Sequence, residues 1–418
     1  MLGSDPAVSL PVRRIAGAVA DAARRWESPD YPPRVRAQAA LAQRTGFSAP
    51  VVEVALDRLM ARLTRQELER TLTGDLGSLD VLDGPARGPY GGTAYAAPVG
   101  TVLVISSTTT IGVGLWSAAL ALCCKNRVVL KEPEDALGAG FFSTLAEEEP
   151  ALRDALQAAS WLGGDGEAEE ALFAQAAAVV AFGSDQTMRA IRARLPASAR
   201  FVGYGNAASA GIVRRGALGD PVTAARAADG AAIDLSLYET TGCLSLHALY
   251  VERGAAVSPE RFASLLAAAL ERRTVEFPVG GRDVAQQAAI RSVRELAAFR
   301  SAGGRGAVFA AGDLAWTLVL EPPAHEPPAF LPRTLALVPV DDVADAAERL
   351  AALRIPIETL GVAPAPAPED AAALATAAAR VGASRVCALG AMQHPHLASH
   401  HGARPRAAEF VRWIDVEP

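Results

Sequence analysis

The chain has 418 residues, half of them hydrophobic, and a formal net charge of −6 at pH 7. This length exceeds the usual size of a single hydrophobic core, so we expect two domains. Acidic and basic residues are mixed throughout without a basic stripe, and nucleic acid is therefore not an expected partner.

Cysteine usage and the N-terminal sequence bear on the compartment. The four cysteines, at positions 123, 124, 243 and 387, lack the paired spacing of zinc sites or disulfide frameworks. Free thiols suit a reducing environment, and the first residues lack a continuous apolar segment of the secretory type. We therefore expect a cytoplasmic protein.

Helical and strand patterns follow one another along the chain. Residues 11–72 have a helical pattern, with Val12, Ile15, Val19 and Ala22 along one face and a break at two prolines, 32 and 33. Beyond them, short apolar runs alternate with helices, which predicts parallel sheets covered on both faces. Strands are expected at 102–105, 127–130, 178–182, 200–202, 211–213, 248–251, 317–320, 335–339 and 386–389. Helices are expected near 115–124, 139–147, 187–195, 259–272, 282–300 and 343–353.

Three stretches need separate interpretation. No residue from Gly91 to Cys124 is charged, which raises the question of a membrane span. Pro98 and the Ser-Thr run at 106–110 interrupt the stretch, so we interpret it as a buried strand, turn and helix. The proline-rich segments at 321–332 and 363–368 are expected to be surface loops.

The segment YETTGCLSLHALYVE, residues 238–252, carries the best nucleophile candidate. Cys243 follows a glycine at the start of an apolar run, and a thiol can attack a carbonyl or thioester carbon. The alternative is a small buried hydrophobic residue, which is what most cysteines are. His247 follows four residues later, but strand alternation would point its side chain away from Cys243.

Candidate cofactor-binding residues follow two predicted strands. No G-x-G-x-x-G follows any strand. Instead, Lys131 and Glu134 follow one strand, and Gly183 and Ser184 follow the next, at the carboxyl ends where ligands of open α/β sheets bind. A helix beginning there would favour a phosphate. The alternative is a pair of ordinary strand-to-helix turns, with Ser184 or Asp185 as the helix cap.

The order of residues 100–105, 129–134, 182–184 and 242–243 resembles the aldehyde dehydrogenase superfamily. Within it, residues 242–252 and the terminal stretch from His401 to 415 look most like the acyl-CoA reductases. That branch includes the long-chain fatty acid reductase of bacterial bioluminescence. The resemblance covers roughly residues 90 to 418.

The resemblance implies an aldehyde-dehydrogenase-like fold of two α/β domains. Residues 1–210 would form N-terminal helices and a nicotinamide-dinucleotide-binding domain. Residues 211–395 would form the catalytic domain with the cysteine loop, and 396–418 a segment packing back on the cleft. A homo-oligomer is expected on the same ground.

The resemblance also implies roles for individual residues. Cys243 would attack an acyl thioester and expel CoA, or the carrier that delivers the acyl group, and hydride from NADPH would then give an aldehyde. Lys131 would bind the adenosine ribose, and Gly183 and Ser184 would lie against the pyrophosphate. The backbone N–H of Cys243 and a polar side chain from residues 106–110 would hold the oxyanion.

The sequence departs from the family pattern at two positions. Gly203, placed among the cofactor-binding residues, stands where aldehyde-oxidising members carry the glutamate that activates water, which argues against hydrolysis. Thr108 stands where the family usually has an oxyanion-binding asparagine, and its hydroxyl reaches less far. Glu134 could accept from a ribose 2′-hydroxyl and repel a 2′-phosphate, so NADH stays open beside the expected NADPH.

Four histidines near the C-terminus, His394, His396, His400 and His401, raise the question of a metal site. Pro395 disrupts helical spacing, and no cysteine or carboxylate lies within the cluster, so no metal is expected. By resemblance, His400 or His401 would contact CoA phosphate or substrate.

The predicted function is NAD(P)H-dependent reduction of an acyl thioester to an aldehyde. Two alternatives remain. One is an aldehyde or semialdehyde dehydrogenase working in the oxidative direction, against which Gly203 counts. The other is a weakly catalytic subunit that holds a partner in a reductase complex, an alternative that the altered turn at Thr108 keeps open.

Overall fold

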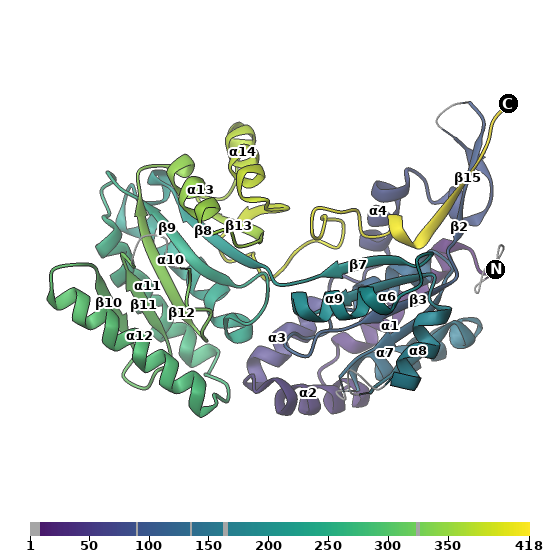
Figure 1. The fold of residues 1–418 in the computed structure, drawn as a ribbon, viewed down its shortest axis with the longest axis horizontal. Coiled ribbons are helices and arrows are strands. Elements are labelled where there is room, and N and C mark those ends of the chain that lie inside the picture. The colour runs from purple at the N-terminus through teal and green to yellow at the C-terminus, as the bar shows by residue number, and fades with distance from the viewer. Residues whose placement is uncertain (1–8, 89–90, 134–135, 162–165, 323–326) are drawn as a thin grey trace. The chain divides into compact units, whose positions relative to one another are not determined.

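A computed structural model describes residues 9–88, 91–133, 136–161, 166–322 and 327–418 (Figure 1). These residues form two compact units. The first holds the described residues of Met1–Thr45 and Val52–Asn206 together with His396–Pro418, and the second holds Gly46–Val51 and Ala207–Pro395.

The first unit is built on five parallel strands in the order β5-β4-β3-β6-β7. The strands are β3 (Thr101–Ile105), β4 (Arg127–Lys131), β5 (Leu156–Ala159), β6 (Ala178–Phe182) and β7 (Arg200–Tyr204). All five residues of β6 are buried, as expected where helices cover both faces. Because β4 and β6 lie on opposite sides of β3, the strand order reverses there, which is where open α/β sheets bind ligands.

Helices surround this sheet. They are α1 (Val12–Glu27), α2 (Pro32–Thr45), α3 (Ala49–Met60, whose first residues belong to the second unit), α4 (Arg65–Leu76), α5 (Asp80–Asp83), α6 (Leu115–Cys123), α7 (Leu137–Glu148), η1 (Pro150–Ala155), α8 (Gly166–Gln175) and α9 (Asp185–Arg194). The predicted face of α1 is confirmed, since Val12, Ile15, Val19 and Ala22 are all buried. The prolines at 32 and 33 open α2, where a missing N–H costs nothing.

A small antiparallel sheet joins the C-terminal residues to the first unit. Its order is β1 (Ala86–Arg87), β2 (Thr93–Pro98) and β15 (Val411–Val416), with η5 (Ala408–Phe410) just before β15. The buried Asn126 fixes this connection, because it accepts from Gly100 N at 3.0 Å and donates to Phe410 O at 2.9 Å. No helix among the described residues combines the length and apolar character needed to cross a membrane.

The second unit has a seven-stranded sheet in the order β10-β11-β12-β9-β8-β13-β14, in which only the β10–β11 pair is antiparallel. Its strands are β8 (Ala208–Val213), β9 (Leu246–Glu252), β10 (Ala307–Ala310), β11 (Thr317–Leu320), β12 (Thr334–Val340), β13 (Ile357–Ala363) and β14 (Arg385–Ala388). Its helices are η2 (Arg215–Ala217), α10 (Pro221–Ser236), α11 (Pro259–Glu276), α12 (Val284–Ala302), α13 (Val343–Ala352), η4 (Pro368–Asp370) and α14 (Ala371–Val381). The segment η3 (Leu237–Thr240) follows α10 and is not a regular helix, because the dihedral angles of Tyr238 and Glu239 are not helical.

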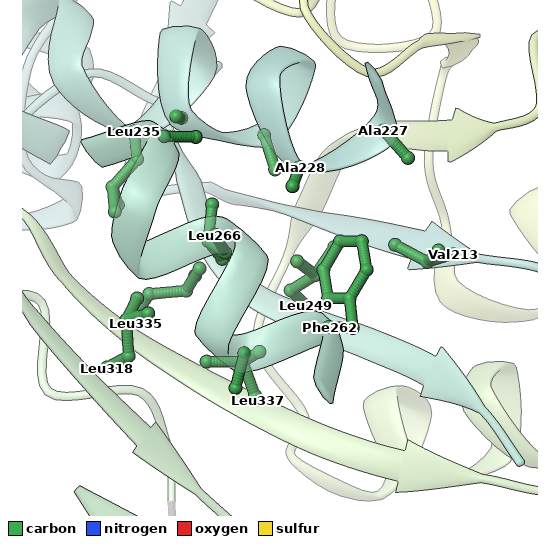
Figure 2. Packing of buried hydrophobic residues seen from close by; sticks show 14 of the residues in the cluster. Val213, Ala227, Ala228, Leu235, Leu249, Phe262, Leu266, Leu318, Leu335 and Leu337 are labelled. Atoms are coloured by element: carbon green, nitrogen blue, oxygen red, sulfur yellow. The ribbon is translucent and has the colours of Figure 1, made fainter. Parts of the chain in front are cut away.

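Both faces of this sheet are covered by apolar packing. Figure 2 shows Phe262 and Leu266 of α11 and Leu235 of α10 packed over Leu249 and Leu337 of the sheet. On the other face, α13 and α14 pack against a second cluster that includes Tyr250 and Leu360. The predicted parallel α/β architecture is confirmed.

Among the elements that the sequence patterns missed are α8 in the first unit and α10, β10, β13 and α14 in the second. Helices α10 and α14 are rich in alanine, which marks a buried face less clearly than larger apolar side chains do. Strand β13 follows Pro356 and contains Glu358 and Thr359, which interrupt its apolar run. The loop predicted at 363–368 begins one residue late, because Ala363 ends β13 and is buried.

Candidate active site

Cys243 lies in a tight turn directly before β9. The turn is closed by Ser245 N donating to Gly242 O at 2.9 Å, and the Ser245 hydroxyl accepts from Gly242 N at 3.2 Å. Gln393 Nε2 donates to that same hydroxyl at 2.9 Å. These bonds fix the residues on either side of Cys243, whose own side chain is half-buried.

Ser209 of β8 connects the cysteine turn to two neighbouring strands. Its hydroxyl donates to Cys243 O at 2.7 Å and accepts from Thr359 N at 3.1 Å. The pairing of β8 with both neighbouring strands is irregular at Ser209. In the β8–β9 pair the register shifts between Ser209 and Ala210, and in the β8–β13 pair it shifts between Ile357 and Thr359. Such irregularities leave His247 and Glu358 without a regular partner, and β-bulges commonly redirect side chains beside active sites.

His247 is buried at the first of these irregularities, where simple strand alternation does not hold. Its Nδ1 accepts from Ser209 N at 3.4 Å, which leaves the ring proton on Nε2. Burial lowers the pKa of His247 to about 4, although contacts with the backbone of Ser209, Ser245 and Thr240 act in the opposite direction. The ring is therefore neutral at pH 7, and its centroid lies 5.1 Å from that of Phe330.

The environment of Cys243 favours the protonated thiol. Burial is the largest effect and the carboxylate of Glu358 the next, and together they raise the pKa of Cys243 to about 11. The backbone amides of Cys243 and Leu244 and the guanidinium of Arg385 act in the opposite direction. A nucleophile in this state has to lose its proton as it attacks.

The other three cysteines differ from Cys243 in their setting. Cys123 and Cys124 are fully buried at the end of α6 and belong to the core. Burial raises the pKa of Cys123 to about 12 and that of Cys387 to about 11. Cys387 lies within strand β14, so Cys243 is the cysteine that lies in a turn without being fully buried.

The backbone that leads into the cysteine turn is strained and clamped. Tyr238, Glu239 and Thr240 have left-handed φ values of 58°, 50° and 61°, a conformation that is costly for residues with a Cβ. Glu239 Oε1 accepts from Arg333 at 2.5 Å and Oε2 from Arg282 at 3.2 Å. All three charged side chains are at most 7% exposed. No sequence signal pointed to this trio, because its members are far apart in the chain.

In the first unit, Lys131 ends β4 and is half-buried. Its ammonium lies 5.7 Å from the ring centroid of Trp161, whose Nε1 donates to Glu169 Oε1 at 2.9 Å. Burial lowers the pKa of Lys131, while Glu169 acts in the opposite direction. The Lys131 side chain thus lies beside an aromatic face at the carboxyl end of the sheet.

Two glutamates follow Lys131 closely in the sequence, and one of them, Glu132, belongs to the described residues. Glu132 accepts from Gly138 N at 2.8 Å and from Ala139 N at 2.9 Å, so its carboxylate caps the start of α7. Glu134, the residue expected to influence the choice between NADPH and NADH, lies outside the described residues.

Gly183 and Ser184 connect β6 to α9. Ser184 caps this helix by accepting from Thr187 N at 3.1 Å, as the helix-cap interpretation predicted. Gly183 is not in the left-handed region, and a Cβ added there would approach no atom closer than 3.5 Å. Packing within the protein therefore does not require a glycine at this position. Because glycine has no side chain, a ligand can approach the backbone of Gly183 closely.

Gly203 is a glycine for a different reason. A Cβ there would lie 2.8 Å from the ring of Phe201 and 3.0 Å from Met188 Sδ. A larger side chain at position 203 requires the Phe201 ring to move. Position 203 therefore offers little ready space for a longer side chain.

Thr108 lies in the turn after β3 with its side chain exposed. Its backbone carbonyl accepts from Arg44, and the neighbouring hydroxyls of Ser107 and Thr109 are 2.9 Å apart. Within the described part of the chain, the Thr108 hydroxyl itself makes no hydrogen bond, so it can donate to a ligand.

Two of the C-terminal histidines, His396 and His401, have different neighbours. The ring of His401 stacks on Tyr204 with centroids 4.0 Å apart, and Tyr204 in turn stacks on Phe182 at 4.8 Å. His396 Nδ1 lies instead 3.1 Å from Arg62. The described residues contain no group of three or more histidine, cysteine or acidic side chains arranged to hold a metal ion.

Comparison with protein families shows to which family the chain belongs. The sequence matches the family described as "Acyl-CoA reductase (LuxC)" over residues 7–413. The chain belongs to this family. The resemblance found in the sequence is thus confirmed, and the protein is an enzyme of the oxidoreductase class. No curated protein sequence matches the chain.

Solved structures place this acyl-CoA reductase family member in the aldehyde dehydrogenase fold. An NAD-dependent benzaldehyde dehydrogenase from Corynebacterium glutamicum matches with a TM-score of 0.69 and 17% identity, covering 99% of this chain and 87% of that one. The indole-3-acetaldehyde dehydrogenase of P. syringae matches with a TM-score of 0.69 and 16% identity, covering 98% and 86%. Aldehyde dehydrogenase 21 of Physcomitrella patens matches with a TM-score of 0.71 and 13% identity, covering 98% and 85%. At these identities the matches establish the fold alone.

Proposed function

We propose that this protein reduces an acyl thioester to an aldehyde through a covalent acyl intermediate on Cys243, with NADPH as the reductant. The observation that carries this proposal is the turn of Cys243, whose flanking residues are fixed by Ser209, Ser245 and Gln393. Membership of the acyl-CoA reductase family supplies the reaction class.

In the first half-reaction, the sulfur of Cys243 attacks the thioester carbonyl, and the bond to the CoA sulfur then breaks. The oxyanion that forms needs hydrogen-bond donors already in place. The backbone N–H groups of Cys243 and Leu244 act to lower the pKa of the thiol and are suited to this role. We assign the side-chain donor to Thr108, because its hydroxyl is exposed and makes no hydrogen bond among the described residues.

Several features of the first unit suit a nicotinamide dinucleotide. Gly183 lies at the strand-order reversal and leaves space for close approach, and Ser184 caps α9, whose N-terminus favours a phosphate. Lys131, at the end of β4, is suited to bind the adenosine ribose. When bound, the cofactor supplies the hydride that converts the acyl group to an aldehyde. The P. syringae dehydrogenase among the structural matches is in complex with NAD+.

Gly203 favours reduction over oxidation of an aldehyde to an acid. Hydrolysis of an acyl-cysteine needs a base that activates water. Phe201 fills the space beside Gly203, and no carboxylate is present at that position. An acyl group on Cys243 would therefore persist until hydride or a thiol arrives.

Intact mass spectrometry tests the proposal. The protein is mixed with a panel of acyl-CoAs and acyl-carrier thioesters without nicotinamide, and any adduct is mapped by peptide analysis. We expect one acyl group on Cys243, and the donor and chain length that react fastest identify the substrate. Cys243→Ala should form none. An adduct retained in that variant, or none in a folded wild type with any donor, contradicts the proposal.

A further inference from the structure

We propose that Glu358 is the acid–base residue of this site, taking the proton of the Cys243 thiol during attack and returning it to the departing CoA sulfur. This inference rests on the proposed function and assigns the proton transfer that the first half-reaction requires. No sequence pattern singled out Glu358, because β13 itself was not predicted.

The geometry begins with the irregularity in β13. Ile357 and Thr359 pair with neighbouring residues of β8, so Glu358 is the extra residue between them. Ser209 connects this part of β13 to the backbone of the cysteine turn, because its hydroxyl bridges Thr359 N and Cys243 O. One serine therefore holds both the segment that contains Glu358 and the turn that contains Cys243.

The carboxylate of Glu358 is itself held in place. Ser384, directly before β14, donates from its hydroxyl to Glu358 Oε1 at 2.6 Å. On the neighbouring strand, Arg385 Nε donates to Thr359 Oγ1 at 3.1 Å, which holds the residue that follows Glu358. A general base has to be positioned, and the bond from Ser384 fixes the carboxylate of Glu358.

Electrostatics connect this carboxylate with the sulfur. After burial, Glu358 is the largest cause of the raised pKa of Cys243, whereas Arg385 acts in the opposite direction. A nearby carboxylate disfavours a standing thiolate, but it can accept the proton while the carbon–sulfur bond forms. The site thus suits concerted proton removal rather than a preformed thiolate.

Other groups around the cysteine turn are poor bases. His247 accepts a hydrogen bond from Ser209 N at Nδ1 and carries its proton on Nε2, so neither ring nitrogen is available to take the thiol proton. Arg385 cannot accept a proton. Among the described residues, Glu358 is the acidic side chain that acts on the Cys243 thiol.

The proton balance closes without a further reactant. As the Cys243 sulfur bonds to the acyl carbon, its proton moves to a Glu358 carboxylate oxygen. When the bond between the acyl carbon and the CoA sulfur breaks, the same proton passes to the CoA thiolate. The step yields acyl-Cys243 and free CoA thiol, and nothing is oxidised or reduced.

Two rates measured on the same variants test the assignment. One is the rate of acyl adduct formation on Cys243 from acyl-CoA, and the other is alkylation of Cys243 by iodoacetamide at pH 8. Loss of a general base typically costs about 10²-fold or more. In Glu358→Gln we expect acylation to fall by about that factor. Alkylation should stay equal or become faster, because a neutral amide no longer raises the pKa of Cys243.

Two further variants complete the test. Glu358→Asp keeps a carboxylate and should retain more acylation than Glu358→Gln. Glu348→Gln is the matched control, because Glu348 is 72% exposed on α13 and should leave both rates unchanged.

The outcomes separate this inference from the proposed function. No adduct in the wild type is a failure of the function itself. A wild-type adduct that Glu358→Gln forms equally fast overturns the role of Glu358 alone. A parallel fall of acylation and alkylation also overturns it, because that result indicates a displaced cysteine turn rather than a lost base.

Discussion

Replacing Glu239 by glutamine tests whether the buried ion trio supports the second unit. The carboxylate accepts from Arg333 at 2.5 Å and from Arg282 at 3.2 Å, and Arg333 is completely buried. An amide can accept at one atom only, and its NH₂ group would face the other guanidinium. Two buried positive charges would then have no compensating negative charge.

The magnitude follows from these contacts. A hydrogen bond to a charged group contributes about 1.5–3 kcal/mol, and removing one member of a buried ion pair costs about 3–5 kcal/mol. We expect Glu239→Gln to lower the free energy of unfolding by about 3–5 kcal/mol. The left-handed residues at 238–240 would lose their anchor, so acylation of Cys243 should slow as well.

Urea unfolding followed by circular dichroism measures the change as a shift in midpoint at constant slope. Glu348→Gln serves as the control, because its carboxylate is exposed and 3.9 Å from Arg380. Surface changes of this kind stay within about 0.5 kcal/mol. A Glu239→Gln protein as stable as the control would refute the idea that the trio holds the strained segment.

Three further predictions concern the cofactor and pH. Gly183→Ala should leave the urea midpoint unchanged, because the added Cβ meets no atom within 3.4 Å. The same variant should bind NADPH at least tenfold more weakly, as measured by calorimetry. An unchanged affinity would contradict the proposed pyrophosphate site at Gly183. Alkylation of Cys243, mapped by mass spectrometry, should rise about tenfold per pH unit towards its pKa of about 11, and a plateau near pH 8.5 would contradict the burial argument. The free energy of unfolding should fall as the pH drops from 6.5 to 4, because His247 takes up its proton at 6.5 when unfolded but only near 4 when folded. The difference between these two pKa values corresponds to about 3 kcal/mol of unfolding free energy. His247→Asn should remove this part of the dependence of stability on pH.

Local patterns in the sequence determined the class of the fold. Buried parallel strands are continuous apolar runs, and the run of β6 was predicted with its observed ends. Lys131, Gly183 and Ser184 were recognised because each directly follows such a run. A strand and its carboxyl end are properties of a few consecutive residues, so the sequence alone determined the parallel sheets and the strand-end positions of these three residues.

Only the tertiary structure decided the surroundings of the nucleophile. Ser209 and Cys243 are 34 residues apart, and Glu239 and Arg333 are 94 apart. Glu358 is placed by an irregular register between two strands, which no periodicity of β13 itself encodes. Contacts of this kind depend on which strands become neighbours, and that choice follows from burial of the whole sheet rather than from any short segment.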